Sequence, residues 1–126
     1  MSNDPNDKNK ALFLSLVQSL AANCWIQLGK HINPISGKLE KNLQEASFTI
    51  DLLDMIRIKT KGNLDNEESL FIEKTISELK MNYVDEKLKE EKEASKKQEE
   101  EKKKEDNRNK KGEKSGEKNK KDKNKG

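Results

Sequence analysis

Two carboxylates, Asp51 and Asp54, lie three residues apart in an otherwise apolar stretch of the chain. On a helix this spacing places both side chains on one side, where they could ligate a divalent cation or share a proton. No histidine lies in that stretch, and Arg57 follows Asp54 at the same spacing as a salt-bridge partner. A solvated or salt-bridged pair therefore fits these residues better than a metal site or an acid–base pair.

One cysteine and one histidine, Cys24 and His31, are the only soft ligands in the sequence. Two ligands are too few for a structural zinc site within one chain, and a Cys–His nucleophile also needs an orienting group and an oxyanion site. Cys24 falls in register with Leu20 and Leu28, so we expect it to be a small buried apolar residue. No glycine-rich phosphate loop is present. The sequence thus predicts no catalytic residue, no metal ligand and no cofactor, and we expect a protein that is not an enzyme.

The corner between the second and third predicted helices is the one candidate for ligand binding, with the residues Lys59, Lys61, Gly62 and Asn63. Two lysines beside the free amides of a new helix could hold a phosphate or a carboxylate. Asp65, Glu67 and Glu68 crowd the same helix start with negative charge. Lysines at the end of a helix also offset its dipole without any ligand. Anion binding is therefore the weaker of the two interpretations of this corner.

The elements that must position these side chains are three predicted helices, near residues 10–28, 42–61 and 66–88. Residues 11–29 carry no charge, and their apolar residues recur every four positions, which is typical of a helix. Gly29 and Gly62 suit helix ends, because glycine readily adopts the left-handed conformation found there. Asn42 and Asp65 suit helix starts, because each can cap and is followed three residues later by a glutamate. We expect an all-α protein with a three-helix domain.

The first predicted helix is apolar on more than one side. Gln18, Asn23 and Gln27 interrupt its apolar surface in different directions, so we expect no insertion into a membrane. Three helices of this size have a marginal core on their own. We expect self-association to complete the helical bundle, through a face formed by Leu14, Ala22, Trp25 and Ile26.

Charge divides the chain into parts. Residues 1–84 hold 10 Lys and Arg against 11 Asp and Glu, whereas residues 85–126 hold 17 against 13. After Leu88 the only apolar residue is Ala94, so no core can form there. The tail lysines could contact nucleic acid non-specifically. Interspersed acidic residues and the absence of aromatic residues argue against a dedicated nucleic-acid-binding surface. We expect a disordered N-terminus at 1–9, a helical domain at 10–88, and a Lys/Glu-rich low-complexity tail at 89–126 that is partly helical and then disordered.

Several short motifs occur in an order that resembles a known family. They are Ser15 to Ala21, Leu28-Gly29, Asn33-Pro34 with Ser36-Gly37, Thr49-Ile50-Asp51-Leu52-Leu53, and Lys59-Thr60-Lys61-Gly62-Asn63-Leu64. From Leu12 to Val84 the sequence is similar to a small bacterial family known only as domain of unknown function 1844. Asp65 stands where the resemblance suggests threonine, which preserves a capping side chain. The resemblance implies a cytoplasmic bacterial helical protein, and it implies no activity.

Taken together, these patterns favour a non-catalytic interaction or structural protein that is homo-oligomeric through its first helix and has an unknown protein partner. The alternative is a nucleic-acid- or ribosome-associated accessory protein that uses the lysine-rich tail. The least favoured interpretation is a small metal- or anion-dependent enzyme built on Asp51 and the Lys59–Lys61 corner. A single cysteine fits a reducing compartment, in agreement with a cytoplasmic location.

Overall fold

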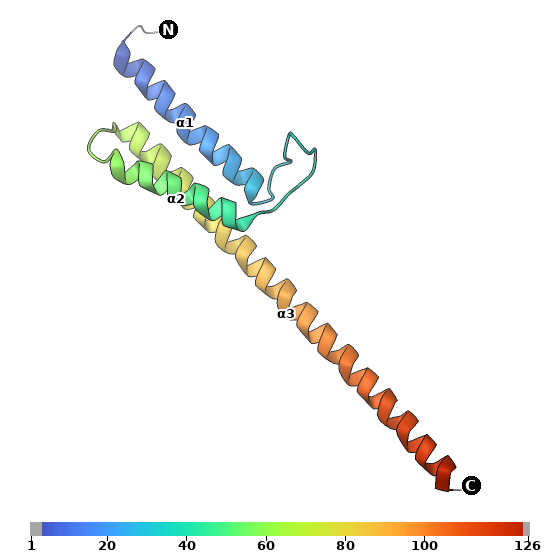
Figure 1. Ribbon diagram of the computed structural model, residues 1–126. Helices are drawn as coiled ribbons and strands as arrows, with labels where there is room; N and C mark the ends of the chain where they lie inside the picture. The colour runs from blue at the N-terminus through green and yellow to red at the C-terminus, as the bar shows by residue number, and fades with distance from the viewer. Residues whose placement is uncertain (1–3, 125–126) are drawn as a thin grey trace. The chain divides into compact units, whose positions relative to one another are not determined.

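Three α-helices make up the computed structural model, which describes the backbone of residues 4–124 and the side chains of residues 4–109. They are α1 (Pro5–Gln27), α2 (Leu43–Lys59) and α3 (Asn66–Asn124) (Figure 1). The chain divides into two units, Met1–Lys87 and Leu88–Gly126, and α3 contributes to both. The all-α, three-helix prediction is confirmed. None of the described helices combines the length and the apolarity needed to span a membrane.

The start of α1 lies five residues earlier than predicted, at Pro5. The side chain of Asp4 accepts a hydrogen bond from the backbone N–H of Asn6 at 3.0 Å, which satisfies one of the free amides of the first turn. Proline fits the following position because it has no N–H to lose there. Part of the segment predicted to be disordered, residues 1–9, is therefore helical from Pro5 onward.

The connection between α1 and α2 is closed by backbone hydrogen bonds. Gly29 adopts a left-handed conformation, with φ of 77°, as expected for a residue that ends a helix. Leu28 and Lys41 form an antiparallel bridge, and the N–H of Asn42 donates to the carbonyl of Gln27 at 2.8 Å. These bonds bring the start of α2 against the end of α1, so the two helices run antiparallel.

The two predicted helix caps are confirmed. The Asn42 side chain accepts from the N–H of Glu45 at 3.1 Å, at the start of α2. At the start of α3, the carboxylate of Asp65 accepts from the N–H of Glu68 at 2.8 Å, and the Glu68 carboxylate accepts from the N–H of Asp65 at 3.0 Å. This reciprocal pair is a capping box, which fixes where the third helix begins. Gly62 precedes it with φ of 89°.

One small core joins the three helices of the first unit. Its buried residues are Val17, Ala21, Cys24, Leu28, Leu43, Ala46, Ile50, Leu53, Ile72, Ile76 and Leu79. Two of these are alanines and one is a cysteine, and the described aromatic side chains that touch this core are only partly buried. The core is therefore modest in volume, as the sequence predicts for a domain of this size.

A buried carboxylate, Glu86, ties α3 to the α1–α2 connection. Its side chain is only 9% exposed, and its two oxygens lie 2.7 Å from Lys30 Nζ and 3.0 Å from Lys41 Nζ. Glu86 lies seven residues after Leu79, so the two side chains project from the same side of α3. No local sequence pattern indicates this contact, because both lysines lie far from Glu86 in the chain.

The second unit consists of α3 from Leu88 onward. Every described side chain from 88 to 109 is exposed, so this part of the helix contributes no core. Opposite charges four residues apart, such as Glu93 with Lys97 and Glu99 with Lys103, each contribute about 0.2–0.5 kcal/mol to a helix. The helix thus continues into the segment that we predicted to be partly helical, and these weak pairs support it there.

We predict that Glu86→Ala destabilises the fold. The substitution leaves two lysines without their shared carboxylate, and charge-assisted hydrogen bonds of this kind contribute about 1.5–3 kcal/mol each when buried. Because both lysines are partly exposed, we expect the free energy of unfolding to fall by about 1–3 kcal/mol. Urea melts give the value. Glu93→Ala, in the exposed part of α3, is the matched control, and an equal effect of the two substitutions would contradict this assignment.

Candidate interaction surface

Asp51 and Asp54 are the two carboxylates that could share a metal ion or a proton, and they lie in different surroundings. Asp54 Oδ1 accepts hydrogen bonds from Arg57 Nη2 at 2.8 Å and from Arg57 Nε at 3.1 Å. These bonds hold the pKa of Asp54 below its ordinary value. Asp51 is exposed to solvent. Asp54 is thus engaged in an ion pair, which leaves no second carboxylate free to work with Asp51.

The thiol of Cys24 is fully buried, and it donates a long hydrogen bond to the carbonyl of Ala46, at 3.6 Å. Burial raises the pKa of the Cys24 thiol to about 11, so the group is protonated at neutral pH and is not the thiolate that a nucleophile or a metal ligand requires. His31 is exposed, and its ring lies 6.1 Å from the Trp25 ring between centroids. Among the side chains that the structure describes, no group of three or more candidate ligands gathers.

The predicted anion corner is exposed but carries its own counter-charges. Lys59, Lys61, Gly62 and Asn63 all face solvent at the end of α2 and in the following turn. Lys10 of α1 reaches the start of α3, where its Nζ lies 3.0 Å from Asp65 Oδ2 and 2.6 Å from Glu67 Oε2. Two carboxylates therefore occupy the position at the helix start where a bound anion would benefit most from the free amides.

The predicted self-association face of α1 is mostly covered. Leu14, Trp25 and Ile26 are half-buried, and Trp25 packs against the core, whereas Ala22 is exposed. Leu16 follows Leu14 by two residues, which is about 200° around the helix. The large exposed side chains of α1 are instead Leu12, at 57%, and Leu16, at 49%.

A second exposed apolar stripe runs along α2. Phe48 is 64% exposed and Met55 is 44% exposed, with half-buried Leu52 between them. Phe48 and Leu52 flank the buried Ile50 at two residues on either side, so they project away from the core. Apolar residues thus occupy two opposite sides of α2, of which only one is buried.

Helix geometry places the exposed apolar residues of α1 and α2 toward the side on which the two helices touch. Thr49 Oγ1 donates to Gln27 Oε1 at 2.7 Å, which marks one side of each helix as the contact side. Leu16 lies eleven residues before Gln27, about three full turns, and therefore on the same side of α1. Leu52 lies three residues after Thr49, on the adjoining side of α2. We name the combined surface the α1–α2 face, made of Leu12, Leu16, Phe48, Leu52 and Met55.

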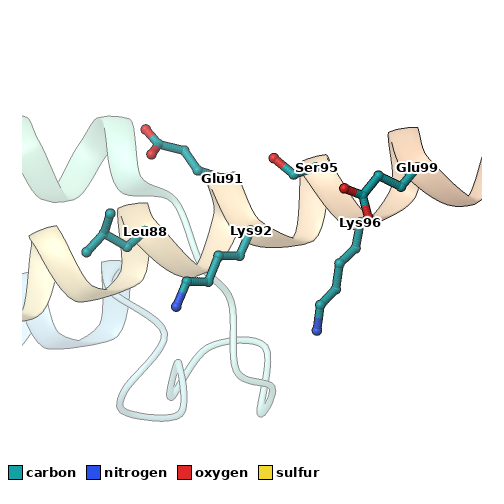
Figure 2. A pocket seen from close by; sticks show the side chains of 6 residues that line it. All are labelled: Leu88, Glu91, Lys92, Ser95, Lys96 and Glu99. Carbon is teal, nitrogen blue, oxygen red and sulfur yellow. The ribbon is translucent and has the colours of Figure 1, made fainter.

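The charged part of α3 offers no comparable site. Figure 2 shows an open groove along this helix, lined by Leu88, Glu91, Lys92, Ser95, Lys96 and Glu99. All six side chains come from α3, and two acidic and two basic groups line the groove. A groove on one side of a single helix cannot enclose a small molecule, which normally needs a concave and mostly apolar site.

Comparison with known proteins identifies a family. The model of a family described as "Domain of unknown function (DUF1844)" matches residues 10–86, which is more than half of the chain and covers α1, α2 and the first turns of α3. No curated protein and no solved structure matches the chain. The match agrees with the resemblance seen in the sequence motifs, and it brings no activity with it.

We predict that the Lys10 cluster contributes to stability between about pH 4 and pH 10. The pKa of Asp65 is lowered, first by the N–H of Glu68 and then by Lys10, so its contribution is lost as the pH falls through that lowered value. The pKa of Lys10 is raised, chiefly by Glu67 and Asp65, so its contribution is lost only at high pH. In Lys10→Met, urea melts should show a loss of stability at pH 7 that shrinks as the pH falls below about 4. An equal loss with Lys8→Met would contradict a specific cluster.

Proposed function

We propose that this chain, which belongs to the family described as domain of unknown function (DUF1844), is a non-catalytic interaction protein that acts as a homo-oligomer. The observation that supports this proposal is the α1–α2 face. This face combines the outer sides of two adjacent helices. It includes Phe48, the most exposed aromatic side chain among the described residues. Exposed apolar side chains on two adjacent helices of a small domain are typical of a protein–protein interface.

The size of this face suits a stable contact. The 17 residues of α2 rise about 25 Å, and two packed helices are about 20 Å wide, so the face covers roughly 500 Å² in projection. The accessible surface of the face is larger than this projected area, because side chains make it uneven. It is comparable with the ~800 Å² that each partner of a standard interface buries. Each large apolar side chain that becomes fully buried contributes about 1.5–3 kcal/mol. Because the core of the first unit is small, this additional burial would be a substantial part of the total stability.

The non-catalytic part of the proposal is supported by the chemistry of the candidate residues. Cys24 is buried and protonated, and Asp54 is engaged with Arg57. The Lys59–Lys61 corner lies beside carboxylates rather than beside an open anion site. None of these groups combines access with an activating neighbour, which is what a nucleophile or a general base requires.

The structure changes which residues of the first helix we place in the oligomer interface. We keep α1 in the oligomer interface, but through Leu12 and Leu16, beside α2, in place of half-covered Trp25 and Ile26. The unpaired, buried Cys24 fits a reducing compartment, so we also propose a cytoplasmic location. A further protein partner would meet whichever apolar side chains the oligomer leaves exposed.

The second candidate, association with nucleic acid, is favoured by one feature of the tail. Residues 88–109 hold eight Lys and Arg and eight Asp and Glu, whereas residues 110–126 hold eight Lys against three acidic residues. The positive excess therefore lies at the very end of the sequence, and it supports salt-sensitive, non-specific contact at most. Binding of a labelled RNA that is lost when residues 110–126 are removed would favour this candidate.

We predict that the purified full-length chain is a dimer or a higher oligomer at micromolar concentration. Burial of the α1–α2 face supplies the free energy, and the mostly uncharged surface of α1 offers little repulsion. Sedimentation equilibrium from about 1 to 100 μM gives the mass directly. A folded monomer over the whole range would overturn the proposal.

A further inference from the structure

We propose that α2 packs antiparallel against α2 of a second copy of the chain, about a two-fold axis that passes close to Leu52. This inference rests on the proposed self-association, and it adds the surface, the orientation and the register. It is carried by the pattern of apolar and charged residues on the outer side of α2. Neither the family match nor the core packing of the first unit supplies it.

The outer side of α2 carries residues that alternate at spacings of three and four. They are Glu45, Phe48, Leu52, Met55 and Lys59. This spacing keeps all five on one narrow stripe, the geometry by which two helices pack along a shared seam. The buried residues of α2, among them Ala46, Ile50 and Leu53, project to the other side. The stripe is thus available to a second helix without any change in the domain core.

The order of residue types along the stripe is almost the same in both directions from Leu52. An acidic residue, Glu45, lies seven residues before Leu52, and a basic residue, Lys59, lies seven residues after it. Phe48 and Met55 lie between Leu52 and the two ends, at four and three residues. Reversing a second copy about Leu52 therefore places Phe48 of one chain beside Met55 of the other, and leucine beside leucine. A two-fold interface requires this kind of self-complementarity.

Charge selects the antiparallel orientation. In that arrangement Glu45 of each copy meets Lys59 of the other, so both ends of the seam carry opposite charges. In a parallel arrangement Glu45 would meet Glu45 and Lys59 would meet Lys59, which places like charges at both ends. Both side chains are exposed in the single chain and are free to reach across such a seam. Complementary charge pairs set orientation and register more than they set affinity.

The neighbouring helix extends the same surface. Leu12 and Leu16 of α1, at 57% and 49% exposure, lie beside the stripe and would pack against the second copy at its edges. No charged residue occurs from Ala11 to Gly29, so α1 adds apolar area without repulsion. The exposed carboxylate of Asp51 lies at the margin of the stripe, where it remains in contact with solvent.

The outer side of α3 in the first unit is a poorer candidate for the same role. Leu70, Met81 and Val84 are 66%, 66% and 53% exposed, but Lys74 and Ser77 interrupt the stripe between them. No acidic and basic residues lie at matching distances from its centre. Leu70 therefore provides an exposed apolar position, matched to Phe48, that the proposed interface does not use.

The first test compares Phe48→Glu with Leu70→Glu in the full chain. The two side chains are 64% and 66% exposed in the single chain, so neither substitution should change the helix content measured by far-ultraviolet circular dichroism. Phe48→Glu should raise the dimer dissociation constant by roughly 100-fold or more, because two copies of the side chain leave the interface. Leu70→Glu should change it less than about threefold. Equal effects of the two substitutions on sedimentation would overturn the proposed surface.

The second test exchanges the charges at the ends of the stripe. Glu45→Lys alone should weaken the dimer by about tenfold, because it replaces two opposite-charge contacts with two repulsive ones. Adding Lys59→Glu to the same chain should restore the original dissociation constant. A parallel seam would show neither the loss nor the recovery, so dissociation constants that are the same for all three chains would overturn the antiparallel orientation.

These tests separate the inference from the proposed function. A wild-type dimer that Phe48→Glu leaves intact overturns this surface but leaves the oligomeric function standing. A wild-type monomer overturns both. A wild-type dimer that Phe48→Glu dissociates and the double exchange restores supports the two-fold α2 seam.

Discussion

Apolar residues on two opposite sides of α2 are the constraint on which the rest of this protein depends. One side, with Ile50 and Leu53, closes the only core of the first unit. The other side, with Phe48 and Met55, is exposed among the residues that the structure describes. A helix with apolar residues on two opposite sides can be covered on both of them, so α2 has the character of a central helix in an assembly that is larger than one chain. Self-association is the simplest way to satisfy that requirement.

Two charged clusters join α3 to other segments of the first unit, in addition to the small core. Glu86 binds Lys30 and Lys41 on one side of the domain, and Lys10 binds Asp65 and Glu67 on another. Both clusters join segments far apart in the sequence, so they fix α3 to the α1 end and to the α1–α2 connection. A domain held in this way keeps the outer side of α2 open without losing its own order.

Local signals in the sequence were sufficient to predict the helices and their caps. Asn42 and Asp65 cap as expected because capping depends on residues within one turn. The start of α1 was predicted too late, since the Asp4-Pro5 signal was overlooked. Glu86 was missed because its lysine partners lie 45 and 56 residues away, beyond the reach of any local pattern. Periodicity likewise shows that α1 has two apolar sides, but not which side its neighbours cover.

The central claim, that α2 pairs antiparallel with α2 of a second copy, is tested most directly by a filtered nuclear Overhauser experiment on a mixture of labelled and unlabelled chains. Phe48 and Met55 lie seven residues apart on one helix, about 10 Å, so contacts between them within one chain are too long to be strong. The two-fold seam predicts strong cross-peaks between the Phe48 ring of one chain and the Met55 methyl group of the other. A dimer without these cross-peaks, or one that shows Phe48 against Phe48, would contradict the account.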